Sequence, residues 1–402
     1  MAYFEDVNTR EQVTGDIDSF GRKRVSEVTT QFDAKQIHDN LPLFIDGRGT
    51  GSDVYDNTTA KTTISTAGSG DYFVKQTKQR FNYQTGKSME FFWTFFDFSE
   101  VPGVTKRVGY FNSSTVDPYD TVLDGFWLES DGTTLRLKVY RSGVEVRNVA
   151  RVDWDDSLDG SGDSGVIHDF GNNTILNADI EWLGVGGLRF FIVKNKARIQ
   201  FHQMDFTDED EVFMSSPNQP MRWEIRQNDV TSGSFSFICG TVGAEGGINR
   251  LGKLFSDNLG ITHINANSTS NKYALIGIRL KASQVDTLID LLTLSVLSLT
   301  NDSALWEVWL NPTVAGTFTY NDVTDSSIQV AKGDPGGTNT VTGGYLLDSG
   351  YLGSESTDRL NIESAIRLGM TIDGTLDEIV LTAQPLSSNL DILGSLTWRE
   401  LV

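Results

Sequence analysis

The feature that most constrains this fold is a two-residue alternation of apolar and polar side chains that recurs along the chain. It is clearest in residues 135–139 (Leu-Arg-Leu-Lys-Val) and 221–226 (Met-Arg-Trp-Glu-Ile-Arg). Side chains two residues apart lie on the same face of a β-strand, whereas a helix repeats every 3.6 residues. Each segment is therefore predicted to be a strand with one dry face and one wet face.

Turn signals surround these strands. Asp131-Gly132 and Ser142-Gly143 flank the first segment, and glycine occurs 39 times in the chain. Short strands joined by tight turns are typical of antiparallel sheets. No long helical period is present, which argues against a doubly wound α/β fold or a TIM barrel. The predicted fold class is all-β, with tandem antiparallel β-sandwich or jelly-roll domains and an irregular N-terminal arm.

The length of 402 residues predicts two or three domains. Residues 1–46 are polar and irregular and are predicted to form the arm, which would lie either across its own domain or across a neighbouring subunit; both remain open. Residues 47–250 are expected to form a first β-sandwich of jelly-roll or lectin-like type, and residues 251–402 a second. The boundary is placed in a Gly/Asn/Ser-rich stretch, residues 243–271.

Two apolar segments carry further structural predictions. In residues 88–98, aromatic side chains occur at both odd and even positions and would therefore lie on both faces of a strand. This predicts a core strand covered on both sides. Residues 285–292 fit a short helical face, whereas residues 292–296 alternate as a strand. The stretch is also too short and too polar to span a bilayer.

The charge balance excludes some partners. The chain has 33 basic and 54 acidic side chains and a formal net charge of -21. Such a surface repels phosphate backbones and anionic lipids, so we expect neither nucleic acid nor membrane as a partner. No cofactor is expected, apart from calcium as discussed next.

An acidic, turn-rich loop offers candidate binding residues. Asp155 and Asp159, with Ser157 between them, approximate the oxygen spacing of a calcium loop. The twelfth position is Val166 rather than glutamate, which excludes an EF-hand and leaves another calcium site or a cluster of Asx turns without metal. Trp154, in the same loop, is expected to be exposed and is the candidate for stacking against a host glycan.

Catalytic patterns are weak. Gly162-Asp163-Ser164-Gly165 is similar to the phrase around a protease nucleophile, but Val166 follows it and no flanking histidine motif accompanies it, so a structural turn is expected. Asp179 or Glu181 near Trp182 would be needed for a glycanase. The prediction is a protein that is not an enzyme, with a polysaccharide depolymerase as the weakest alternative.

Several longer phrases resemble a family of virion structural proteins of tailed phages and large environmental viruses. They begin at Arg24 (RVSE), Lys75 (KQT), Asn82 (NYQTGKS), Glu181 (EWLGVG) and Ser215 (SSPNQPMRWEI). The resemblance implies a component of the virion exterior, such as a capsid decoration or a tail- or fibre-associated protein, assembled in the host cytoplasm. It also implies major capsid or tail proteins as partners and a homo-oligomer, with a trimer favoured. The alternative is a glycan-binding adhesin for host attachment on the same fold.

Overall fold

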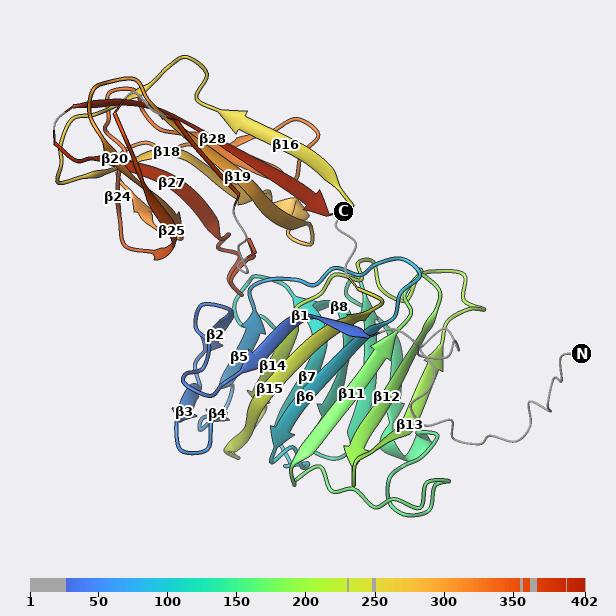
Figure 1. The fold of residues 1–402 in the computed structure, drawn as a ribbon. Coiled ribbons are helices and arrows are strands. Elements are labelled where there is room, and N and C mark those ends of the chain that lie inside the picture. The colour runs from blue at the N-terminus through green and yellow to red at the C-terminus, as the bar shows by residue number, and fades with distance from the viewer. Residues whose placement is uncertain are drawn as a thin grey trace, which may run out of the picture. The chain divides into compact units, whose positions relative to one another are not determined.

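The computed structural model describes residues 27–229, 231–247, 251–354, 357–361, 367–387 and 389–401. The chain forms two compact units (Figure 1). Unit 1 comprises Met1–Thr77 and Tyr83–Asn249, and unit 2 comprises Lys78–Asn82 and Arg250–Val402. The sequence pattern offered no sign that the short segment Lys78–Asn82 belongs to unit 2. Within the described residues, no helix has the length and apolar character needed to cross a membrane.

Unit 1 is a sandwich of two antiparallel sheets. The eight-stranded sheet has the order β13-β12-β11-β6-β15-β4-β3, with β1 added to β15, and the seven-stranded sheet has the order β10-β9-β8-β7-β14-β5-β2. Its elements are β1 (Val28–Lys35), β2 (Ile45–Gly49), β3 (Ser52–Asp56), β4 (Lys61–Thr66), β5 (Tyr72–Thr77), β6 (Met89–Phe96), β7 (Val104–Ser113), β8 (Val122–Ser130), β9 (Leu135–Arg141), β10 (Val144–Ala150), the 3-10 turn η1 (Arg151–Asp153), β11 (Thr174–Ile180), β12 (Gly187–Lys194), β13 (Ala197–Asp205), β14 (Met221–Gln227) and β15 (Gly233–Glu245).

Aromatic side chains fill the space between the two sheets of unit 1. Phe91 on β6 packs edge-on against Phe126 of β8, with ring centroids 5.6 Å apart. Trp223 on β14 stacks on Phe237 of β15 at 4.6 Å. All four side chains are fully buried. Rings of this size each bury a large apolar area, so contacts of this kind hold the two sheets together.

The predicted strands at 135–139 and 221–226 are present as parts of β9 and β14. The wet face expected for β14 is wrong, however, because Arg222 and Glu224 are as deeply buried as the apolar residues between them. Arg222 donates to the carbonyl of Tyr119, which lies in the loop between β7 and β8. This loop covers the outer face of the sheet there, a tertiary contact that alternation alone cannot reveal.

The structure partly corrects the prediction of an irregular N-terminal arm. Residues 1–26 lie outside the described residues, but β1 is a strand paired antiparallel with β15, with one shift of register between Thr30 and Phe32. Phe32 and Ala34 on β1 are buried in unit 1, and Tyr55 donates to the carbonyl of Gln36 at 2.8 Å. This part of the arm is therefore ordered on its own domain, because it has apolar side chains to bury and a sheet edge to pair with.

Unit 2 is a second antiparallel sandwich. Its five-stranded sheet has the order β16-β28-β19-β26, with β17 on β28, and its eight-stranded sheet has the order β21-β24-β18-β27-β20-β25, with β23 on β18 and β22 on β23. Its elements are β16 (Lys253–Asn258), β17 (Ile264–Ala266), β18 (Lys272–Leu280), the 3-10 turn η2 (Ala282–Gln284), β19 (Leu288–Ser298), β20 (Ala304–Leu310), β21 (Thr313–Val314), β22 (Asn321–Asp322), β23 (Ile328–Lys332), β24 (Thr340–Thr342), β25 (Tyr345–Leu352), β26 (Thr357–Asn361), β27 (Glu378–Pro385) and β28 (Leu390–Leu401).

The helical alternative for residues 285–292 is wrong, because Leu288–Ser298 is strand β19. β19 pairs with β28 along most of its length. Close approach of the two sheets is visible at Gly394 on β28, where an added Cβ would lie 3.1 Å from a Leu275 methyl on β18. The described chain is thus all-β, as the sequence predicts, apart from two single 3-10 turns.

Candidate functional site

The loop that the sequence singled out folds back onto unit 1. Trp154 is only 5% exposed, and its indole N–H donates to the carbonyl of Val149 at 3.2 Å. Its ring packs against Phe201, with centroids 4.7 Å apart, and against Phe170. The expected exposure of Trp154 is therefore wrong: Phe201 from β13 and Phe170 from the same connection as Trp154 cover the ring, and no open face is left for a sugar ring.

The carboxylates of Asp155 and Asp159 accept hydrogen bonds from different parts of the protein. The Asp155 carboxylate accepts the Gln203 N–H at 3.0 Å, whereas the Asp159 carboxylate accepts the Ser161 N–H at 2.8 Å in an Asx turn. Hydrogen bonds from the Ser161 hydroxyl, the Ser161 N–H and the Ser157 side chain lower the pKa of Asp159 to about 2. Across the described ranges, no group of three or more His, Cys, Asp or Glu side chains is arranged to hold a metal. Calcium binding by this loop stays a prediction.

The protease-like phrase forms a turn. The Ser164 hydroxyl accepts the Val166 N–H at 3.1 Å, and the Ser164 N–H donates to the buried Asp156 carboxylate at 2.9 Å. Asp156 also accepts the Leu158 N–H at 2.9 Å. The buried acid in this loop, which the sequence analysis did not single out, therefore organises the turn.

Asp179 belongs to an ionic network on the outer face of the eight-stranded sheet. It is fully buried and forms a bidentate pair with Arg189, at 2.8 and 2.7 Å. Arg198 donates to the same carboxylate at 2.6 Å and lies 3.4 Å from Glu90. Bidentate Arg–carboxylate pairs are strong and geometrically fixed. Asp179 is thus held by two guanidinium groups, whereas Glu181 lies beyond the end of β11 and is half-buried.

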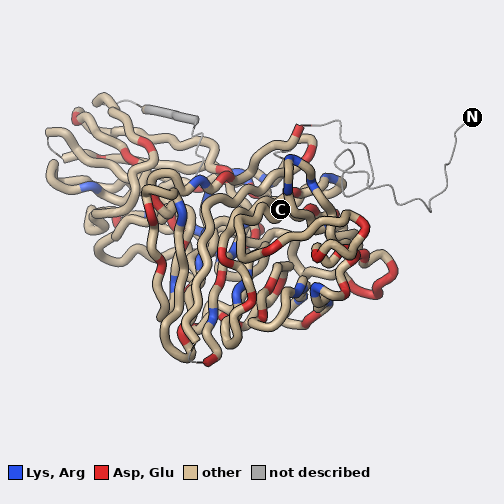
Figure 2. Tube along the Cα trace, turned by 90° about the horizontal axis from the view of Figure 1, so that it is seen from below, with Lys and Arg blue, Asp and Glu red and all other residues tan. Residues whose placement is uncertain are grey.

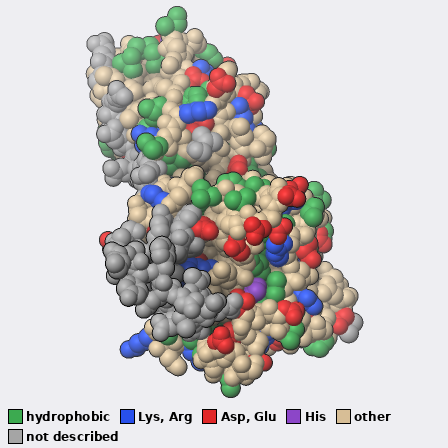
Figure 3. Space-filling model, turned by 90° about the vertical axis from the view of Figure 1, so that its right-hand side faces the viewer, with side chains coloured by type: hydrophobic (Ala, Val, Ile, Leu, Met, Phe, Trp, Pro, Cys, Tyr) green, Lys and Arg blue, Asp and Glu red, His purple; other side chains and the backbone are tan. Residues whose placement is uncertain are grey.

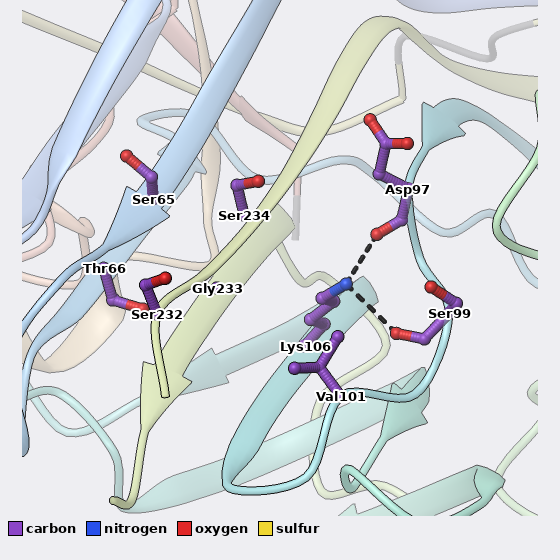
Figure 4. A pocket seen from close by; sticks show the side chains of 9 residues that line it. All are labelled: Ser65, Thr66, Asp97, Ser99, Val101, Lys106, Ser232, Gly233 and Ser234. Atoms are coloured by element: carbon purple, nitrogen blue, oxygen red, sulfur yellow. Dashed lines mark hydrogen bonds between the residues drawn. The ribbon is translucent and has the colours of Figure 1, made fainter. Parts of the chain in front are cut away.

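A pocket of about 450 Å³ lies at one end of the unit 1 sandwich (Figure 4). Four segments build it: the end of β4, the connection from β6 to β7, β7 itself and the start of β15. Its lining residues are Ser65, Thr66, Asp97, Ser99, Val101, Lys106, Ser232, Gly233 and Ser234. Five of the nine carry a hydroxyl group, of which that of Ser65 is hydrogen-bonded to the Ser52 hydroxyl at 2.9 Å, and Lys106 supplies one ammonium group.

Lys106 is the buried charge of this pocket. It is 2% exposed, and its Nζ donates to the carbonyls of Asp97 at 2.6 Å and Ser99 at 3.0 Å. Figure 4 shows the Asp97 carboxylate pointing away from the ammonium group while the Asp97 carbonyl faces it. Burial lowers the pKa of Lys106 to about 8, although Asp97 and Glu100 act in the opposite direction.

Sequence reasoning missed Lys106, although a signal was present. In residues 104–108 (Val-Thr-Lys-Arg-Val), the lysine lies two positions from each valine and therefore on the same strand face, and both valines are buried. A lysine on the dry face of a strand seldom occurs without a partner or a role. The hydroxyl residues of the pocket gave no comparable signal, because serine and threonine are abundant throughout the chain.

No family model matches this chain, and no curated protein matches it. Solved structures give distant similarities. The carbohydrate recognition domain of Emp47p is 13% identical, with 55% of this chain and 98% of that chain covered and a TM-score of 0.35. A legume lectin-like domain from Entamoeba histolytica is 12% identical, with 54% and 98% covered and a TM-score of 0.33. A β-glucanase of Bacillus licheniformis is 9% identical, with 52% and 96% covered and a TM-score of 0.36. These similarities are too distant to carry a functional argument.

Proposed function

We propose that this chain is a structural component of a virus-particle exterior that acts through protein–protein interfaces. The phrases beginning at Arg24, Lys75, Asn82, Glu181 and Ser215 support this location through their resemblance to virion structural proteins. Under the proposal, the partners are major capsid or tail proteins and further copies of the chain. The protein would be assembled into particles in the host cytoplasm.

The observation that carries the interface role is the edge strand β25 of unit 2. β25 is the last strand of its sheet within the described residues, since only β20 pairs with it. Three of its large side chains are exposed: Tyr345 by 47%, Leu346 by 49% and Tyr351 by 75%. An edge that combines unpaired backbone groups with exposed aromatic and aliphatic side chains is a template for pairing with another chain.

The charged surface suits assembly with selected partners. Asp and Glu residues are spread along both units (Figure 2), and on the described part of the face in Figure 3 small hydrophobic groups lie between acidic and basic side chains. A large net negative charge keeps a concentrated protein soluble and disfavours indiscriminate association. Contact then depends on local groups of exposed apolar side chains, such as the three on β25.

The first experiment is gold-labelled antibody electron microscopy of intact particles. Label over the shell would support a decoration protein, and label at the tail would support a tail or fibre component. Absence of label from every particle would contradict the proposal. The companion variant carries Leu346→Lys and Tyr351→Lys, which should leave folding unchanged, because both side chains are exposed, and should reduce incorporation into particles.

The N-terminal arm can be tested separately. Removal of residues 1–46 would delete β1 and its buried Phe32, so a loss of incorporation could reflect unfolding. Removal of residues 1–26 alone leaves β1 in place. If the arm binds a neighbouring subunit, this shorter protein should fold with normal stability and fail to enter particles, whereas normal incorporation would contradict a role for the arm.

Glycan binding is the second candidate function. Burial of Trp154 removes the stacking platform on which it first rested. The hydroxyl-lined pocket at Lys106 now favours it, because hydroxyl and ammonium groups are suitable partners for a polar ligand.

A further inference from the structure

We propose that the unit 1 pocket binds a singly charged oxyanion group, a carboxylate or a sulfate, on a small hydroxyl-bearing molecule such as an acidic monosaccharide. Lys106 supplies the positive charge, and the hydroxyl groups of the wall supply hydrogen bonds. The inference gives the second candidate function a ligand class, and it stands whether or not the protein is part of a virus particle.

The first argument is the unbalanced charge of Lys106. Among the described residues, no carboxylate forms an ion pair with it, and its two hydrogen bonds go to neutral carbonyls. An ammonium group has three N–H donors, so one remains. Asp97 and Glu100 act on this ammonium group without an ion pair to it, and a buried charge without a directly paired counter-ion is costly, so a bound anion would offset the remaining cost. The lowered pKa of Lys106 is consistent with this imbalance.

The contrast with Lys75 is informative. Lys75 is also almost fully buried in unit 1, but its Nζ lies 2.7 Å from the Asp53 carboxylate. The chain therefore neutralises one buried lysine internally and leaves the other facing a cavity. If Lys106 served only to hold the turn after β6, its two hydrogen bonds to backbone carbonyls would suffice, and no cavity with hydroxyl-bearing residues in its lining would be needed beside it.

The second argument comes from the hydroxyl groups of the wall. Thr66 is 97% buried, and its hydroxyl has no hydrogen-bond partner in the described protein. Most buried hydroxyl groups do have a partner, so each exception calls for an explanation. Ser99 is half-buried, Ser232 and Ser234 are exposed, and the hydroxyls of all three form no hydrogen bond with the described residues, so they are accessible to water or to a ligand. Each of them can donate to an oxyanion.

The size and chemistry of the pocket narrow the ligand. A volume of about 450 Å³ is in the range of small-molecule sites. Its lining contains no aromatic ring, so it offers no surface for stacking against the apolar face of a neutral sugar. Asp97 and Glu100 carry negative charge near Lys106, which disfavours a polyanion. A single charge flanked by hydroxyl groups fits best.

Isothermal titration of the full chain with sodium glucuronate, sodium acetate and glucose tests the proposal. Glucuronate should bind at least about tenfold more tightly than glucose, which lacks the charge. Tighter binding of glucuronate than of acetate would support recognition of the sugar hydroxyls beside the charge, whereas equal binding of the two would contradict the hydroxyl part of the proposal. Equal affinity for glucuronate and glucose, or no binding of either anion at tens of millimolar, would overturn the proposal.

Two variants locate the binding. Lys106→Met removes the charge and keeps the length, and it should weaken glucuronate binding by at least about tenfold. Lys253→Met is the matched control, because Lys253 is an exposed lysine of unit 2, and it should leave binding unchanged. If Lys106→Met does not fold, Thr66→Val, which keeps the shape and removes the hydroxyl, should weaken binding by several-fold. Unchanged binding in both folded pocket variants would contradict the assignment.

Discussion

Replacing Glu224 with glutamine tests the ionic network that the buried face of β14 carries. The Glu224 carboxylate is fully buried and accepts hydrogen bonds from Arg222 at 2.9 Å, from Arg107 at 3.0 Å and from Arg226. Glutamine keeps the shape of the side chain and removes its charge. Arg107 would keep its ion pair with Glu129 at 2.7 Å, but the fully buried Arg222 would lose its carboxylate partner, which leaves buried positive charge without compensation.

The magnitude follows from the electrostatics of this carboxyl group. Burial alone would raise the pKa of Glu224, but Arg222, Arg226 and Arg107 outweigh burial and lower it from 4.5 to about 2. A shift of this size corresponds to about 3 kcal/mol of stability. Breaking a buried ion pair by removal of one partner costs a similar ~3–5 kcal/mol. Because the pKa is lower in the folded state, this stability is present above pH 4.5 and is lost as the pH falls toward 2.

The assay is urea unfolding at neutral pH. Hydrogen exchange of the β14 amides monitors the unfolding, so that the measured free energy of unfolding is that of unit 1. Glu224→Gln should lower the free energy of unfolding by about 3 kcal/mol and should remove part of the acid sensitivity below pH 4.5. Glu145→Gln is the control, since the Glu145 side chain is 40% exposed and lies 3.8 Å from Lys138. It should cost less than ~1 kcal/mol. A Glu224→Gln protein within about 1 kcal/mol of the wild type would refute the electrostatic reasoning.

Three further predictions concern other buried groups. Burial lowers the pKa of His168 from 6.5 to about 4, so the free energy of unfolding of unit 1 should fall by about 3 kcal/mol as the pH falls from 6.5 to 4. In His168→Gln, the free energy of unfolding should depend less on pH over the same range. Trp154→Ala should destabilise unit 1 by ~3–5 kcal/mol in urea unfolding without weakening glucuronate binding, whereas a selective loss of binding would restore the stacking hypothesis. In unit 2, both oxygens of the buried Glu400 carboxylate accept the Ser327 N–H, at 3.0 and 2.9 Å, so Glu400→Gln should cost ~1.5–3 kcal/mol, measured by hydrogen exchange at β28.

The sequence predicted the fold class because alternation and turn residues act locally. The prediction succeeded at residues 135–139, where β9 has buried Leu135, Leu137 and Val139. It failed on the faces of β14, because a loop about one hundred residues away covers Arg222. It also failed at residues 285–292, where pairing of β19 with β28 overrides the helical spacing.

The candidate site was less predictable for a related reason. The composition of its loop indicated that Trp154 is exposed, but Phe201, on the distant strand β13, and Phe170, near the end of the same connection, supply its burial. Four segments form the pocket at Lys106. Of its features, the sequence shows only that Lys106 alternates with apolar residues on the buried face of β7. Sequence can identify a misplaced charge, but the hydroxyl groups that surround it become neighbours only through the fold.

The assignment of Lys78–Asn82 to unit 2 has a practical consequence for dissecting this protein. Its neighbours Thr77 and Tyr83 both belong to unit 1, so the polypeptide leaves and re-enters unit 1 before its final exit near Asn249. Within unit 2, the Met370 N–H donates to the Lys78 carbonyl at 3.0 Å. A protease cut near residue 249 would therefore leave part of unit 2 on the N-terminal fragment. A recombinant protein that begins at Arg250 would lack this segment and its hydrogen bond, so adding it back as a separate peptide should restore lost stability.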